Sequence, residues 1–174
     1  MSMMQKGHAI TIPGTNLNAD TAMGWYLGMD GLPPEEIASQ FMAGIDPEIA
    51  KLTKNGDILV CGKNFGYGKV HQALYTAMRV LDLKCIVAES FSTQLIQSAM
   101  NGNVFLVEIP DILNSVKMGD EIEVDVETAT LTNLTQNKVI KGKPFPPFML
   151  EVMKSGGQMA YLARKVMMRK QQQG

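Results

Sequence analysis

The sequence has few residues of the kinds that bind metal ions. Its 174 residues include only two cysteines, Cys61 and Cys85, and two histidines, His8 and His71. An iron-sulfur cluster needs about three or four thiolates, and a structural zinc site needs about four cysteine or histidine ligands. We therefore expect this chain alone to hold no metal. Both cysteines lie in apolar runs, which predicts buried free thiols in a reducing cytoplasm.

A strong charge of one sign is also missing, as are long apolar runs. The chain has 16 basic and 17 acidic residues, a formal net charge of -1 and 6% aromatic residues. Such a composition provides neither the positive field nor the stacking side chains that nucleic acids require. The longest apolar runs are shorter than the roughly 20 residues that span a bilayer. We expect a soluble cytoplasmic protein with no nucleic-acid or membrane partner.

Apolar strand patterns alternate with helical patterns through most of the chain. The β-branched runs at 57–62 and 84–90 flank a helical pattern over 69–83, and a further helix and strand are predicted at 92–102 and 104–109. This order is typical of parallel strands joined by right-handed crossovers. A strand is expected at 8–14, a long loop at 15–34, and two short helices between 34 and 56.

The last third of the chain has a different pattern. Residues 120–135 alternate between apolar and polar, which predicts an antiparallel hairpin at the edge of the sheet. Two helices separated by Gly156 and Gly157 follow. With no repeat and no long linker, residues 1–174 are predicted to form a single domain. The fold class is α/β, with a mostly parallel central sheet, a peripheral β-hairpin and C-terminal helices.

The stretch "GKNFGYGKVH" at residues 62–71 joins a predicted strand to a predicted helix. Such a turn places backbone N–H groups at a helix N-terminus, where they favour a carboxylate or phosphate. The spacing matches neither the dinucleotide fingerprint nor the P-loop. Lys69 and His71 offer two titratable groups there, one able to act as a base and both able to bind an anion. The alternative is an ordinary turn with two solvated cations.

Five stretches, taken in order, resemble the 3-isopropylmalate dehydratase small subunit of the aconitase superfamily. They are "GDILVCGKNFGYG", "IVAESF", "AMNGNVFLVEIPD", "GDEIEVDVETATLTNLT" and "PFPPFMLEVMKSGGQMAYLARK". The resemblance implies a swivelling β/β/α domain that closes over a separate large subunit. That large subunit would carry a 4Fe-4S cluster, and this chain would be a hydro-lyase small subunit that is active only with it.

The same resemblance implies roles for the glycine loop. In the family, the second glycine is followed by Ser-Ser-Arg, where the first serine is the catalytic base and the arginine binds a substrate carboxylate. Here Lys69 and His71 stand at these two positions, so Lys69 would be the base and His71 the carboxylate anchor. The residues of the loop expected to contact substrate are Asn64, Gly66, Tyr67, Gly68 and Val70.

The stretch "NADTAMGWYLGM" at 18–29 resembles a second motif of the family, which begins Asp-Thr-Asp. Asp20 is kept and is expected to be catalytic, whereas Asn18 replaces the first aspartate. Trp25, Gly28 and Met29 are expected to contact substrate. In the family, an arginine after Tyr-Leu goes with a further carboxylate, so the uncharged Gly28 and Met29 imply, by this resemblance, an alkyl group. The implied substrate is a small dicarboxylate, a malate of the 3-isopropylmalate or 2,3-dimethylmalate type.

Two other functions are compatible with the changed loop. A non-catalytic paralogue that serves as a structural or ligand-binding partner subunit would explain the loss of Ser-Ser-Arg directly. A stand-alone phosphate-binding protein is a further possibility, since it requires only the anion-facing turn.

Overall fold

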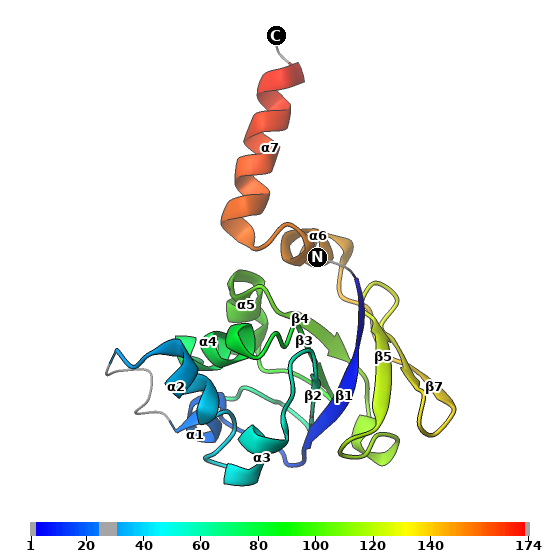
Figure 1. Ribbon diagram of the computed structural model, residues 1–174. Coiled ribbons are helices and arrows are strands. Elements are labelled where there is room, and N and C mark those ends of the chain that lie inside the picture. The colour runs from blue at the N-terminus through cyan, green and yellow to red at the C-terminus, as the bar shows by residue number, and fades with distance from the viewer. Residues whose placement is uncertain (1–2, 25–30, 173–174) are drawn as a thin grey trace.

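A seven-stranded mixed sheet forms the centre of the molecule (Figure 1). The computed structural model describes residues 3–24 and 31–172. The strand order is β4-β3-β2-β1-β5-β6-β7. The parallel strands are β1 (Met4–Ile12), β2 (Ile58–Cys61), β3 (Cys85–Ala88) and β4 (Phe105–Glu108). The antiparallel strands are β5 (Glu121–Asp125), β6 (Thr130–Asn133) and β7 (Lys138–Lys141), and β5 pairs with β1.

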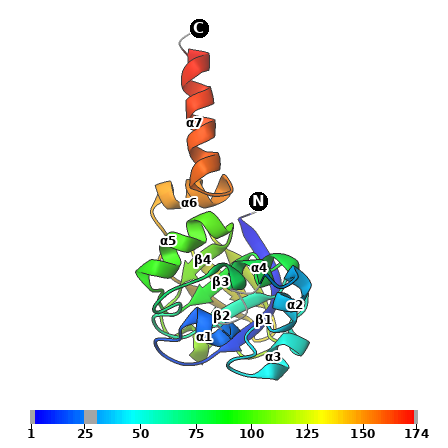
Figure 2. The ribbon, with the colours of Figure 1, turned by 90° about the vertical axis from the view of Figure 1, so that its left-hand side faces the viewer.

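Seven α-helices are described. They are α1 (Ala19–Met23), α2 (Pro34–Ser39), α3 (Pro47–Leu52), α4 (Gln72–Val80), α5 (Thr93–Gly102), α6 (Pro147–Lys154) and α7 (Gln158–Gln172). A short 3-10 helix, η2 (Ile112–Asn114), precedes β5. Helices α1 to α5 lie on one side of β1 and the antiparallel strands on the other, while α7 projects from the body (Figures 1 and 2). None of the helices in the described part of the chain is long and apolar enough to cross a bilayer.

The burial of the strands follows from these layers. β2 and β3 are buried along their whole length, as expected for parallel strands covered by helices. β5 and β6 instead alternate between buried and partly exposed residues, since one face meets the core and the other meets solvent. Phe41, Phe65 and Phe105 are completely buried in the hydrophobic core. The predicted α/β fold with a parallel centre and C-terminal helices is confirmed.

Several predicted elements differ from the structure. The strand predicted at 8–14 is β1, which runs from Met4 to Ile12. The hairpin has a third strand, β7, whose short and mostly exposed sequence gives little hydrophobic pattern. The predicted loop at 15–34 contains α1, a helix of five residues. Helix α4 begins at Gln72, so Lys69 lies in the preceding loop and not in the helix. The backbone of His71 is extended there, with φ -91° and ψ 176°.

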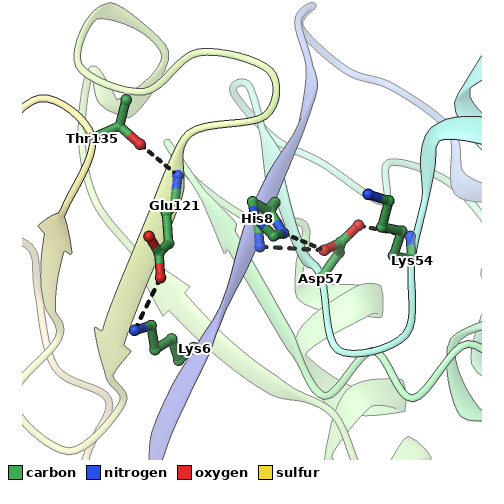
Figure 3. Close-up of polar contacts among 6 residues, drawn as sticks. All are labelled: Lys6, His8, Lys54, Asp57, Glu121 and Thr135. Atoms are coloured by element: carbon green, nitrogen blue, oxygen red, sulfur yellow. Dashed lines mark hydrogen bonds and ion pairs between the residues drawn. The ribbon is translucent and has the colours of Figure 1, made fainter.

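The other histidine of the chain, His8, contacts the buried Asp57 at the amino end of β2 (Figure 3). His8 Nδ1 lies 3.4 Å from Asp57 Oδ1, and the backbone N–H of His8 donates to the same oxygen at 3.2 Å. The other carboxylate oxygen accepts from the N–H of Lys54 at 2.7 Å. On the opposite side of β1, Lys6 pairs with Glu121 at 2.9 Å. Asp57 therefore joins β1 to the turn that precedes β2.

Asp120, at the entrance to β5, is a second buried carboxylate with several donors. It accepts from the N–H of Lys117 at 2.8 Å, from Asn133 Nδ2 at 2.8 Å and from Gln136 Nε2 at 2.5 Å. Burial by itself raises the pKa of Asp120, but these hydrogen bonds outweigh burial and hold its pKa below the ordinary value. The ionised carboxylate thus stabilises the fold at neutral pH.

The Asp120→Ala variant is expected to lose about 2–4 kcal/mol of the free energy of unfolding at pH 7, because buried donors lose their acceptor. A carboxyl whose pKa is lower in the folded state stabilises above its unfolded pKa and loses this effect as pH falls. The gap between variant and wild type, measured by urea denaturation, should therefore shrink below about pH 4. The exposed control Glu127→Ala should change stability by less than about 0.5 kcal/mol. A gap that stays constant down to pH 3 would contradict the role of the charge.

Candidate active site

The glycine loop lies beyond the carboxyl ends of β2 and β3. After β2, the loop pairs with the segment that follows β3, through a parallel bridge between Phe65 and Phe91. The N–H of Phe65 donates to the carbonyl of Ser90, and the N–H of Ser92 donates to the carbonyl of Phe65, both at 3.0 Å. Ligands of parallel sheets commonly bind at this edge. The loop is therefore fixed by the sheet before it reaches α4.

Two glycines allow this loop to approach its neighbours closely. Gly66 has φ +79° and Gly68 has φ +83°, a region that favours glycine. A Cβ atom at Gly66 would lie 2.6 Å from Cβ of Leu95 on α5. At Gly68 it would lie 2.5 Å from Nδ2 of Asn18, the N-cap residue of α1. The loop is thus packed between α5 and α1.

The Gly66→Ala variant is expected to lose about 2–4 kcal/mol of the free energy of unfolding, because it combines a positive φ with a clash in the core. Chemical denaturation measures this loss. Gly119→Ala is a matched control, since Gly119 also has a positive φ, of +82°. A methyl group added at Gly119 would have no atom of the described residues within 4 Å. The control should lose only about 1 kcal/mol, the conformational part of the effect. Equal losses in the two variants would contradict close packing at Gly66.

The loop does not present the free row of N–H groups that the sequence predicted. The N–H groups of Gly66 and Tyr67 both donate to the carbonyl of Leu17, at 2.9 and 3.1 Å. The N–H of His71, just before α4, donates to Oδ1 of Asp20 at 2.8 Å. The expectation of an open backbone anion site is therefore wrong for these positions. A carboxylate does lie at the start of α4, but it belongs to the chain itself.

Asp20 also holds the His71 side chain. Its Oδ2 lies 2.5 Å from Nδ1 of the imidazole. Asp20 is only 8% exposed, whereas the His71 side chain is 59% exposed. An ionised carboxylate only accepts hydrogen bonds, so this contact requires a proton on Nδ1. The buried aspartate therefore occupies Nδ1 and leaves Nε2 as the ring nitrogen available to a ligand.

Lys69 and His71 face a shared open cavity of about 460 Å³. The opposite wall is a polar stripe on α5, formed by residues spaced three or four apart. The lining residues are Lys69, Val70, His71, Gln94, Gln97, Ser98 and Asn101. Two basic side chains, three amides and a hydroxyl suit a small molecule rich in carboxylate and hydroxyl oxygens.

The four residues from α5 were missed in the sequence analysis. Their spacing places them on one helix face, opposite the buried Leu95 and Ala99, and this was the available signal. The spacing gives no information about which loop the face meets. Behind this helix face, burial raises the pKa of Tyr75 to about 12. The charge of Asp20 also raises this pKa, whereas the hydrogen bond with Ser98 lowers it. Tyr75 is therefore protonated at neutral pH and is no base.

The structure brings some of the predicted site residues together and leaves others apart. Lys69, Val70 and His71 line the cavity, and Asp20 lies behind His71. Other predicted residues shape or flank the loop without lining this cavity: Asn64, Gly66, Tyr67 and Gly68. The side-chain amide of Asn64 donates to Oδ1 of Asn16 at 2.8 Å. Trp25, Gly28 and Met29 lie outside the described residues.

The cysteines of this chain do not fit an iron-sulfur cluster. Cys61 and Cys85 are free thiols buried in β2 and β3, and burial raises the pKa of both, that of Cys85 to about 12. Thiols held protonated in a core are poor metal ligands. Within residues 3–24 and 31–172, no three His, Cys, Asp or Glu side chains are grouped so that they could hold a metal ion.

Comparisons with known proteins agree on one relationship. The chain is 41% identical over 133 residues to the isopropylmalate/citramalate isomerase small subunit of Methanocaldococcus jannaschii, covering 76% of this chain and 79% of that protein. It is 38% identical over 124 residues to the 3-isopropylmalate dehydratase small subunit of Caldicellulosiruptor saccharolyticus, covering 71% and 72%. No family model matches the chain.

A solved structure also matches. The fold is similar to a crystal structure of 3-isopropylmalate dehydratase from Methanocaldococcus jannaschii, with a TM-score of 0.84, 28% identity and coverage of 97% of this chain and 99% of that one. Together, fold and relatives define the class as small subunits of hydro-lyases. Within this class, the chain belongs to the 3-isopropylmalate dehydratase small-subunit family, which confirms the predicted resemblance.

Proposed function

We propose that this chain acts with a cluster-bearing large subunit to dehydrate or isomerise an alkyl-substituted malate. The observation that carries the proposal is the cavity shared by Lys69 and His71, with the buried Asp20 behind the imidazole. Two relatives are named for isopropylmalate, and one of these also for citramalate. Both compounds are malates with one alkyl substituent. The substrate of this chain would be of the 3-isopropylmalate or 2,3-dimethylmalate type.

Lys69 is the proposed base. Dehydration of a malate removes a proton from the carbon next to a carboxylate and a hydroxyl group from the neighbouring carbon. A neutral lysine amine can take that proton once the cavity is covered and water is excluded. Lys69 is exposed in the isolated chain. Its activity as a base would therefore depend on assembly with the large subunit.

His71 is the proposed carboxylate anchor, and Asp20 positions it. With Nδ1–H donated to Asp20, a protonated ring presents Nε2–H to a substrate carboxylate as a charge-assisted hydrogen bond. The amides of Gln94, Gln97 and Asn101 would bind the remaining carboxylate and hydroxyl oxygens. Val70 supplies an apolar contact beside them. Trp25, Gly28 and Met29 stay predictions for the contact with the alkyl group.

The large subunit would supply the iron-sulfur cluster and the surface that covers the cavity. We place the 4Fe-4S cluster on it, since the two cysteines here are buried and protonated. The cavity beside Lys69 is open, and a second subunit could cover it and exclude water. Residues 1–174 would act as one swivelling domain within a cytoplasmic heteromer.

Anaerobic co-expression with the large subunit of the same organism tests the proposal. The purified complex would be offered 3-isopropylmalate, 2,3-dimethylmalate and citramalate, with citrate as a substrate that carries an extra carboxylate. We expect turnover of at least one alkyl-malate and little or none of citrate, followed through the unsaturated product. Turnover of citrate alone would contradict the proposed substrate class. A stable complex without turnover would instead support a non-catalytic partner subunit, and phosphate binding by the isolated chain would support a binding protein.

A further inference from the structure

Helix α7 has an exposed apolar face of a kind that normally packs against another element. Met159, Leu162, Ala163, Val166 and Met167 recur at the i, i+3, i+4, i+7 and i+8 spacing of one helix face. The four large side chains of this set are 51% to 79% exposed. We call these five residues the α7 stripe. A continuous apolar face that is exposed to water marks an interaction site.

The aromatic contact between α7 and α6 involves Tyr161, which is not part of the α7 stripe. Tyr161 packs edge-on against Phe148 of α6, with ring centroids 5.5 Å apart. Lys165 Nζ lies 5.2 Å from the centroid of the Tyr161 ring. Tyr161 and Lys165 are four residues apart and, by helical spacing, lie on a different face of α7 from the stripe. The helix extends away from the sheet in both views (Figures 1 and 2). The α7 stripe therefore remains available to a partner.

The charges of α7 indicate what kind of surface would bind it. The helix contains Arg164, Lys165, Arg169 and Lys170 but no aspartate or glutamate. A second α7 could cover the apolar side chains, but it would offer no carboxylate to these four cations. An apolar groove with acidic residues along its edges would satisfy both the stripe and the charges.

The origin of α7 lies next to the candidate active site. A Cβ atom at Gly157, just before α7, would be 3.1 Å from the carbonyl oxygen of Met100 and 3.6 Å from Cα of Asn101. Asn101 is one of the residues that line the cavity with Lys69 and His71. A subunit that covers this cavity would therefore meet the base of α7. We infer that the α7 stripe docks the large subunit in an acid-edged apolar groove, an inference that rests on the proposed heteromer.

The test compares binding of the large subunit to three forms of the full-length chain. Leu162→Asp/Val166→Asp places two charges in the stripe, and both positions are exposed, so the fold should remain intact. Val139→Asp is the matched control, since Val139 is 65% exposed on β7 and lies outside α7. We expect the double variant to weaken binding at least about 30-fold, measured by calorimetry, and the control to bind like wild type. Circular dichroism should show the same fold for all three.

The outcomes separate the inference from the proposed function. If wild type binds the large subunit and the double variant binds it equally well, the inference is overturned and the heteromer stands. If wild type does not bind at all, both fail. If the double substitution abolishes self-association, or binding to anionic vesicles, without weakening the large-subunit complex, then the stripe serves another partner and the inference is also overturned. A milder Leu162→Ser/Val166→Ser variant should weaken binding in the same direction.

Discussion

Replacing Lys69 by methionine is expected to lower kcat of the assembled complex about 10³-fold, within the range for loss of a general base. Methionine keeps an unbranched side chain of similar length but has no amine to take the proton. Lys69 is exposed in the isolated chain, so its replacement should not affect folding. Because the amine would act in the transition state, KM should change little compared with kcat. Steady-state kinetics of the reconstituted complex measure both quantities.

Two further variants test whether the loss of activity is specific to the amine of Lys69. Lys63→Met changes another exposed lysine of the same loop, which does not line the cavity, and it should leave kcat unchanged. Lys69→Arg keeps the positive charge but cannot act as a base, because arginine stays protonated. We expect Lys69→Arg to be as slow as Lys69→Met. Recovery of activity in the arginine variant would show that position 69 supplies a cation, and full activity in Lys69→Met would place the base on the large subunit.

The strands other than β7, and the larger helices, could be predicted from the sequence because each one depends on local pattern. β2 and β3 are apolar runs of β-branched residues, and α5 has Ser92 as its N-cap, whose side chain accepts from the N–H of Leu95. The five residues of α1 follow an Asn N-cap in a polar stretch without clear periodicity. A helix this short forms because of its tertiary packing and not because of its own sequence, so the sequence alone predicts a loop here.

The candidate site is harder to predict because its contacts are long-range. Asp20 and His71 are 51 positions apart, and only the packing of α1 beside α4 brings them together. The pattern at residues 62–71 predicts an anion at the start of the helix, and a bound ligand was the expected source. In the structure, the carboxylate of Asp20 takes that position, as the positive end of a helix favours. Residues 62–71 alone do not reveal that this anion comes from Asp20, which lies far away in the sequence.

The contact between Asp20 and His71 predicts a second large effect on activity, that of the Asp20→Asn variant. The side-chain oxygen of asparagine can still accept from the N–H of His71, but its amide group then faces Nδ1 and can only donate to it. Nδ1 must lose its proton or turn away, so the doubly protonated ring is no longer supported. We expect kcat/KM to fall about 10- to 100-fold, as for loss of a hydrogen bond to a charged group, mainly through a higher KM.

The position of the imidazole proton distinguishes the two explanations, because a loss of fold stability alone would not change it. Nitrogen NMR of the imidazole should report a proton on Nδ1 in wild type and its loss in Asp20→Asn. The matched control is Asp57→Asn, because Asp57 is also a buried carboxylate that contacts Nδ1 of a histidine, His8, at the opposite end of β2 (Figure 3). The control should lower stability while leaving KM unchanged. If both variants raise KM equally, Asp20 acts through the stability of the fold and not through the orientation of His71.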